Sequence, residues 1–209
     1  LGLVGSEMCI RDRDYAEPMA QIILVHHARG LTDGVRALAE QIAAGGHTVH
    51  TPDLYDGRVF DTDADALAHL DELGDEFLAR GIAATAEHRS ASVIAGIGAG
   101  LRPAFKAAQT VPAFRACIGV SAALPMNAYA PLWMPHVALQ LHLASRDPWV
   151  IDDALPLARS YAATTEQPDH PADLFEYDTD AHLFMDATDP GYDPALTETL
   201  VRRIHELLA

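Results

Sequence analysis

Three separated parts of the sequence hold residue types that together could carry out acyl transfer. Glycines alternate at positions 96, 98 and 100 directly after a short apolar run, a pattern typical of a sharp turn between a strand and a helix. When the central residue of such a turn is serine or cysteine, the turn presents a nucleophile, and glycines on both sides make room for the tight backbone. Asp147 and His182 follow along the chain, in the order in which an orienting carboxylate and a general base accompany that nucleophile.

The central residue of the turn, Gly98, has no side chain that could attack a carbonyl group. Without a nucleophile the turn cannot form an acyl-enzyme. Three explanations are consistent with the sequence. The nucleophile has been lost, or Ser121 at the end of the next apolar run replaces it, or codon 98 contains a sequence error.

The same glycines also have to be compared with the dinucleotide-binding pattern G-x-G-x-x-G. The third glycine, Gly100, comes one position too early for that pattern. About 20 residues further on, the chain reads Val120-Ser121 where an acid would bind the ribose. The sequence therefore predicts no cofactor.

Other reactive side chains have structural as well as chemical interpretations. His26, His27 and His182 lack a metal-binding spacing such as H-E-x-x-H, so no metal site is expected. Asp147 precedes a proline and is also typical of a turn or a helix cap. Cys117 lies within an apolar run and is expected to pack as a small core residue.

Apolar runs typical of buried strands alternate along the chain with segments of helical periodicity. The strands are expected at 21–26, 47–52, 93–95, 115–120, 137–143 and 173–177. The helices are expected after Thr32 or Asp33, at 64–79, after Gly100, at 152–163 and at 194–208. This alternation predicts an α/β protein with a single doubly wound, mainly parallel sheet and helices on both faces. Catalytic groups of such proteins collect at the carboxyl ends of the strands, where all three candidate positions are expected.

Length and composition exclude several classes of protein. A chain of 209 residues, 49% of them hydrophobic, fits one domain with a sizeable core. No apolar run approaches the roughly 20 residues that a membrane span needs.

The formal net charge of −16 and the single lysine, Lys106, argue against a nucleic-acid partner. Cys9 and Cys117 match no metal or redox spacing, which favours a reducing cytoplasm. The sequence carries no signal for an oligomeric state.

Near the start of the chain, residues 3–12, which read LVGSEMCIRD, resemble the translated adapter of a sequencing library. They have neither the cationic start nor the sustained apolar stretch of a signal peptide. We therefore expect residues 1–18 to be a non-native, disordered extension, Met19 to be the native start, and residues 19–209 to form the domain.

Several landmarks, in order and at similar intervals, resemble the dienelactone hydrolase family over essentially all of residues 19–209. The landmarks are HHARGL at 26–31, HTVHTPDL at 47–54 with Gly57-Arg58, the glycines at 96 and 100 with Pro103, Asp147-Pro148, and YDTDAHLF at 177–184. The family has the α/β-hydrolase fold, and its members cleave enol-lactones and related esters with a cysteine or serine nucleophile.

The resemblance assigns an expected role to each candidate residue. His182 would be the general base and Asp147 its orienting carboxylate. The backbone N–H groups of Ala28 and Ala99 would form the oxyanion hole, and His27 would be a polar residue of the substrate pocket. Gly98 departs from the family pattern, so the resemblance implies a weakly active or inactive hydrolase of small esters or lactones. The alternative is a non-catalytic protein that binds a small molecule or a partner.

Overall fold

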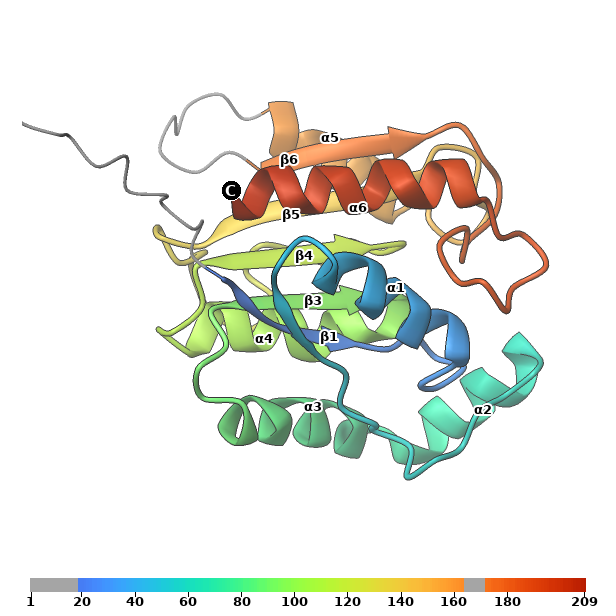
Figure 1. The fold of residues 1–209 in the computed structure, drawn as a ribbon, viewed down its shortest axis with the longest axis horizontal. Coiled ribbons are helices and arrows are strands. Elements are labelled where there is room, and N and C mark those ends of the chain that lie inside the picture. The colour runs from blue at the N-terminus through green and yellow to red at the C-terminus, as the bar shows by residue number, and fades with distance from the viewer. Residues whose placement is uncertain (1–18, 164–171) are drawn as a thin grey trace, which may run out of the picture.

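The computed structural model describes residues 19–163 and 172–209, so the expected extension at 1–18 lies outside the described residues. At the centre of this part of the chain is a six-stranded parallel sheet with the strand order β2-β1-β3-β4-β5-β6 (Figure 1). The strands are β1 (Gln21–Val25), β2 (Thr48–His50), β3 (Val93–Ile97), β4 (Ala116–Val120), β5 (Ala138–Ala144) and β6 (Ala172–Tyr177). The helices are α1 (Asp33–Ala43), α2 (Asp63–Leu73), α3 (Asp75–Glu87), α4 (Leu101–Thr110), α5 (Ala154–Ala163) and α6 (Pro194–Leu208).

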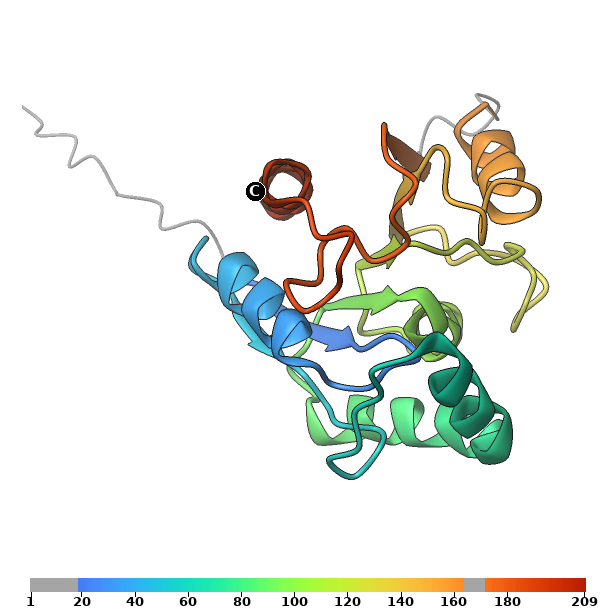
Figure 2. The same cartoon turned by 90° about the vertical axis from the view of Figure 1, so that its right-hand side faces the viewer.

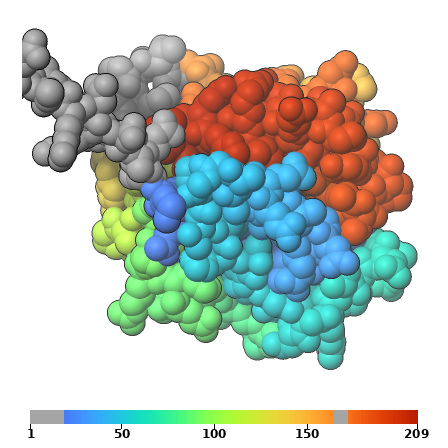
Figure 3. Space-filling view, in the orientation of Figure 1, coloured from blue at the N-terminus to red at the C-terminus, as the bar shows by residue number. Residues whose placement is uncertain are grey.

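Helices cover both faces of the sheet, as the alternation of apolar runs predicts. One hydrophobic core joins α1 and α6 to the sheet, and a second core joins α3, α4 and α5 to the opposite face. Figure 2 shows the sheet edge-on between these two layers. In the space-filling view, α6 and α1 lie side by side and close the first face (Figure 3). The predicted doubly wound α/β architecture is confirmed.

The direction of winding changes between β1 and β3. The chain passes from β1 outward to the edge strand β2, and then returns to place β3 on the other side of β1 before continuing to β6. Crevices of open α/β sheets form where the carboxyl ends of two such strands diverge. Here those ends carry the segment after Val25 and the turn at Gly98.

The single helix expected at 64–79 is wrong in its extent. The structure has two helices, α2 and α3, which are separated at Gly74 and continue to Glu87. Gly74 has a φ of 51°, a left-handed conformation that only glycine adopts without strain. Leu70, Leu73 and Phe77 keep a helical spacing of apolar residues across Gly74. Periodicity alone therefore does not reveal the break.

Strand β5 alternates apolar and polar residues in sequence, but both of its faces are buried. The polar residues Gln140 and His142 are 2% and 0% exposed. His142 donates its Nε2–H to Gln140 Oε1 at 2.9 Å and accepts the Tyr177 hydroxyl proton at Nδ1 over 2.8 Å. Gln140 Nε2 in turn donates to the backbone carbonyl of Arg203 on α6 at 3.2 Å. Buried polar side chains are tolerated when they are hydrogen-bonded in this way.

A second buried histidine connects the end of β1 to the loop after β2. His26 donates its Nδ1–H to the His27 carbonyl at 2.8 Å and accepts the Leu54 N–H at Nε2 over 3.1 Å. Burial lowers the pKa of His26 to about 4 and the pKa of His142 to about 3. Both rings are therefore neutral in the folded protein.

We expect these two histidines to make the protein sensitive to mild acid. Below their ordinary pKa of 6.5, the unfolded chain binds protons that the folded chain does not, so the free energy of unfolding falls as the pH falls. Each histidine should remove about 2 kcal/mol between about pH 7 and about pH 4.5. Urea unfolding at both pH values measures the loss. A His26→Asn variant should lose less stability over this range than the wild type, whereas a variant of the exposed His136, His136→Asn, should keep the wild-type profile. An equal loss of stability in the wild type and both variants would contradict the conclusion that buried His26 makes the protein sensitive to acid.

Candidate active site

The turn between β3 and α4 has the backbone of a nucleophile-bearing turn. A β-carbon on Gly96 would lie 2.3 Å from the Gly100 carbonyl oxygen, and one on Gly100 would lie 2.5 Å from the carbonyl oxygens of Val25 and His26. These positions accept only glycine. At Gly98, which has a φ of 51°, a β-carbon would meet no atom closer than 3.6 Å. The central position therefore has room for a side chain, although its backbone conformation favours glycine.

His182 and Asp147, which are 35 residues apart, meet at this turn. The Nδ1–H of His182 donates to Asp147 Oδ2 at 2.6 Å. A neutral ring in this tautomer has its unprotonated Nε2 free to accept a proton, and Nε2 would lie 3.6 Å from a β-carbon on Gly98. An oxygen bonded to that carbon would be within hydrogen-bonding reach of Nε2. The arrangement can therefore remove a proton from a nucleophile placed beside Gly98.

Asp147 is also the turn residue that its position before Pro148 predicts. Its second oxygen, Oδ1, accepts the backbone N–H of Trp149 at 2.9 Å, and the side chain is fully buried. One carboxylate thus fixes both the His182 ring and the start of the segment that carries Trp149. The interpretations as a turn residue and as the partner of His182 are compatible.

Ser121 lies at the rim of the same site but points its hydroxyl elsewhere. Its Oγ donates to the backbone carbonyl of His182 and its N–H donates to the His142 carbonyl at 2.9 Å. The side chain is 2% exposed, and the residue has an unusual positive φ of 58°. The hydroxyl holds the His182 loop in place instead of facing the His182 ring. This geometry favours a positioning role for Ser121 over that of a replacement nucleophile.

The two residues expected to form the oxyanion hole, Ala28 and Ala99, border the same space. Ala28 follows β1 and Ala99 is in the single helical turn at Gly98–Gly100; both residues line the pocket. Within residues 19–163 and 172–209, the Ala28 N–H has no hydrogen-bond acceptor. The N–H of Ala99 lies in the first turn of a helical segment, where N–H groups have no acceptor within the helix. Both groups can therefore donate to a bound carbonyl oxygen.

His27 is held by a carboxylate that sequence analysis missed. The His27 ring is 2% exposed, donates its Nε2–H to Asp186 Oδ2 at 2.7 Å, and accepts the Arg29 N–H at Nδ1 over 3.2 Å. Since both ring nitrogens are occupied, His27 fixes the loop that carries Ala28. The only local sign of a buried acid is that Asp186 follows three apolar residues, Leu183-Phe184-Met185.

Asp186 joins the segment after His182 to the loop after β1. Its carboxylate accepts four hydrogen bonds, from the His27 ring, the Thr32 hydroxyl, and the N–H and hydroxyl of Thr188. Burial alone would raise the pKa of Asp186, but these hydrogen bonds outweigh burial and hold the pKa well below its ordinary value. Asp186 therefore remains ionised, and it couples the position of His182 to that of Ala28.

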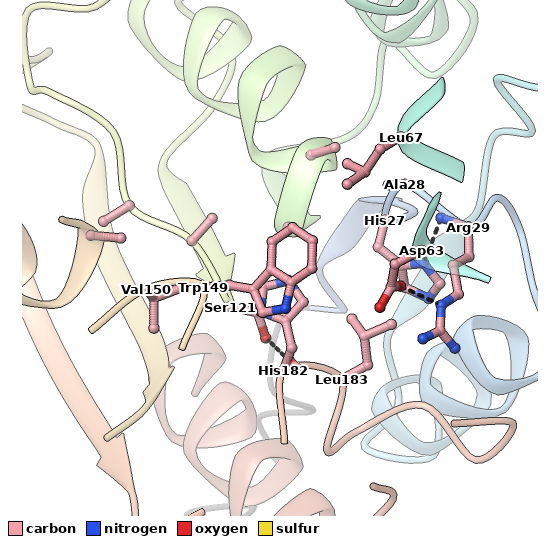
Figure 4. Close-up of a pocket in the computed structure, with 15 residues that line it drawn as sticks. His27, Ala28, Arg29, Asp63, Leu67, Ser121, Trp149, Val150, His182 and Leu183 are labelled. Atoms are coloured by element: carbon pink, nitrogen blue, oxygen red, sulfur yellow. Dashed lines mark hydrogen bonds and ion pairs between the residues drawn. The ribbon is translucent and has the colours of Figure 1, made fainter. Parts of the chain in front are cut away.

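A pocket of about 220 Å³ is lined by His27, Ala28, Gly98, Ala99, Ser121 and His182 together with neighbouring residues (Figure 4). Trp149 and Val150 lie on one side of the pocket, and Arg29 and Asp63 lie on the opposite side. Cys117 takes no part, because it is buried within β4 and burial raises the pKa of its thiol. Among the described residues, no three His, Cys, Asp or Glu side chains cluster as a metal site would require.

Comparison with known proteins is consistent with this geometry. The model of the dienelactone hydrolase family matches residues 10–209. The chain belongs to the dienelactone hydrolase family. None of the curated proteins compared with this family member matches it significantly.

The described part of the chain contains no helix with the length and apolar character of a membrane span.

Solved structures share the fold of this dienelactone hydrolase family member at low sequence identity. A dienelactone hydrolase-like promiscuous phosphotriesterase from metagenomic libraries has a TM-score of 0.68 and 18% identity, over 92% of this chain and 87% of its own. A protein from Klebsiella pneumoniae assigned to the dienelactone hydrolases has a TM-score of 0.66 and 16% identity, over 95% and 89% of the two chains. A protein from Xanthomonas campestris assigned to the α/β-hydrolase superfamily has a TM-score of 0.62 and 24% identity, over 90% and 96%. These similarities establish the α/β-hydrolase fold.

Proposed function

We propose that this protein is a slow hydrolase of small carboxylic esters or lactones, in which water takes the place of the missing nucleophile. The observation that carries the proposal is the hydrogen-bonded pair of His182 and Asp147 beside Gly98. The pair supplies a general base, and Gly98 leaves space for a water molecule within reach of that base. The family assignment supports hydrolysis as the reaction class.

In the proposed mechanism, a water oxygen attacks the carbonyl carbon while His182 Nε2 accepts a water proton. The negative charge that develops on the carbonyl oxygen is stabilised by the N–H groups of Ala28 and Ala99. Asp147 stabilises the imidazolium ion. The tetrahedral intermediate collapses when the bond to the leaving oxygen breaks, and His182 transfers its proton to that oxygen. The products are a carboxylic acid and an alcohol, and no acyl-enzyme forms.

The proposed activity should be weak. General base catalysis contributes about 10² to 10⁴ in rate, and sites that lack a triad residue retain about 10³ to 10⁴ over the uncatalysed reaction. A full acyl-enzyme mechanism is faster because it divides a difficult step into two easier ones.

Steady-state assays on a panel of activated esters and lactones test the proposal. We expect slow turnover that is linear in enzyme concentration, is lost in a His182→Ala variant purified in the same way, and is reduced but retained in Ser121→Ala, because the serine hydroxyl only holds the His182 loop. Mass spectrometry of the reacting mixture should find no acyl group on the protein. Fast turnover that Ser121→Ala abolishes, or an acyl group on Ser121, would show that the serine is the nucleophile.

A non-catalytic binding protein is the second candidate function. Its support is that Gly98 removes the nucleophile while the pocket and its hydrogen bonds are intact. Thermal stabilisation by small carbonyl compounds, without product formation by the wild type, would favour binding over hydrolysis.

A further inference from the structure

The two sides of the pocket differ in chemistry. One side carries Trp149 and Val150, from the segment that leads into α5, and the opposite side carries Arg29 and Asp63 together with Leu67. Trp149 is 56% exposed, and its ring centroid lies 5.7 Å from that of His182. Figure 4 shows the indole directly beside the His182 ring. An exposed tryptophan beside the proposed base offers a contact surface for an apolar substrate group.

The opposite side carries charge, but its cation is already paired. Arg29 donates through Nε to Asp63 Oδ1 at 2.7 Å, and its Nη1 lies 2.9 Å from Asp189 Oδ2. The Arg29 side chain is only 17% exposed, whereas the Asp63 side chain is 50% exposed. Arg29 is thus paired with two carboxylates, and one of them, that of Asp63, lines the pocket.

The electrostatic consequence is that the charged side of the pocket, or rim, offers no unpaired cation. Arg29 and Asp63 line the pocket, and Asp189, which pairs with Arg29 from outside the lining, brings the net charge of the three groups to −1. The hydrogen bond from Arg29 lowers the pKa of Asp63, so its carboxylate stays ionised. The formal charge of the chain, −16, adds a field of the same sign. A substrate with a carboxylate would be repelled at this rim and would find no unpaired cation there.

We propose that the site selects uncharged esters or lactones whose apolar acyl group lies against Trp149, and that it discriminates against substrates that carry a carboxylate. The inference rests on the proposed function for the reaction, but the charge preference belongs to the pocket and can be measured without turnover. Arg29, Asp63 and Trp149 are then residues that determine specificity.

Unreactive amide analogues provide the first test. Butyranilide and succinanilic acid have the same anilide group and the same chain length, and differ in ending with a methyl group or a carboxylate. We expect calorimetry on the wild-type protein to give butyranilide a Kd about tenfold lower than that of succinanilic acid. Equal binding, tighter binding of the acid, or binding of neither ligand would overturn the inference.

Three variants then assign the preference to the rim and to the tryptophan. Asp63→Asn removes the exposed rim charge and leaves Arg29 paired with Asp189 alone, so the ratio of the two Kd values should fall about fivefold. Asp61→Asn removes a charge from an exposed neighbouring position and should leave the ratio unchanged. Trp149→Ala should weaken butyranilide about tenfold, because the apolar contact is lost. A ratio that responds equally to Asp61→Asn and Asp63→Asn would mean that general charge, rather than this rim, sets the preference.

Turnover separates this inference from the proposed function. p-Nitrophenyl butyrate and p-nitrophenyl hemisuccinate are the matched ester pair, and each rate is corrected for spontaneous hydrolysis. If the amides show the expected preference and the wild type hydrolyses neither ester, the proposed function fails and the charge preference stands. If both esters are hydrolysed with equal kcat/KM, the charge preference fails and the proposed function stands.

Discussion

Replacing Gly98 with serine is expected to increase ester hydrolysis about 10²- to 10³-fold over the wild type, because it restores an acyl-enzyme route. The geometry supports this gain. A β-carbon at this position would lie 3.6 Å from His182 Nε2 and 3.7 Å from the β-carbon of His27, so the serine oxygen can hydrogen-bond to the base without moving the backbone. Values of kcat/KM for p-nitrophenyl butyrate measure the gain, and rapid-quench mass spectrometry should detect an acyl group on the new serine.

The matched control for this variant is Gly98→Ala. Both variants place a β-carbon at a φ of 51°, so both should lose about 1 kcal/mol of stability from backbone strain. Only serine supplies a nucleophile. If Gly98→Ala is as active as Gly98→Ser, or if neither exceeds the wild type, then the His182 ring is not aligned with position 98 as the structure indicates.

The second large effect concerns Asp147. In the Gly98→Ser background, Asp147→Asn should lower kcat about 10³- to 10⁴-fold. An amide neither orients the His182 ring in the required tautomer nor stabilises the imidazolium ion, and loss of the carboxylate has an effect of this size in serine proteases. The fold should survive, because the asparagine Oδ1 can still accept the Trp149 N–H. Activity on p-nitrophenyl butyrate and circular dichroism together test both statements.

The exposed Asp152, in the segment that leads into α5, provides the matched control for Asp147. Asp152→Asn removes the same charge from the same part of the chain and should leave kcat within about twofold of the parent variant. A similar loss in both variants would indicate a general electrostatic effect. Little loss in Asp147→Asn would show that the carboxylate does not act through His182.

Local features of this protein could be predicted because neighbouring residues determine them. The apolar runs gave the strands to within a few residues, and helix α1 begins after Thr32, whose hydroxyl accepts the Val35 N–H at 3.1 Å. The alternating glycines likewise predicted the strand-turn-helix, because the backbone there is too close for β-carbons at Gly96 and Gly100. The absence of a nucleophile at Gly98 is itself a property of the sequence.

Tertiary structure decided what depends on residues that are distant in the chain. The order of the strands brings His182 Nδ1 to 2.6 Å from Asp147 Oδ2, whereas only the order of the two residues along the chain could be read from the sequence. Burial of Gln140 and His142 depends on α6, and two of the four hydrogen bonds to Asp186 come from His27 and Thr32 in the distant loop after β1. The pairing of Arg29 with Asp63 and Asp189 likewise joins residues that are distant in the chain. Local propensity and periodicity describe how a segment folds, but the partner of a buried charge is set by packing between segments. The sequence alone therefore determined the fold class and the glycine at the centre of the turn, and only the tertiary structure decided which groups hold the site in place and which charges pair at the pocket.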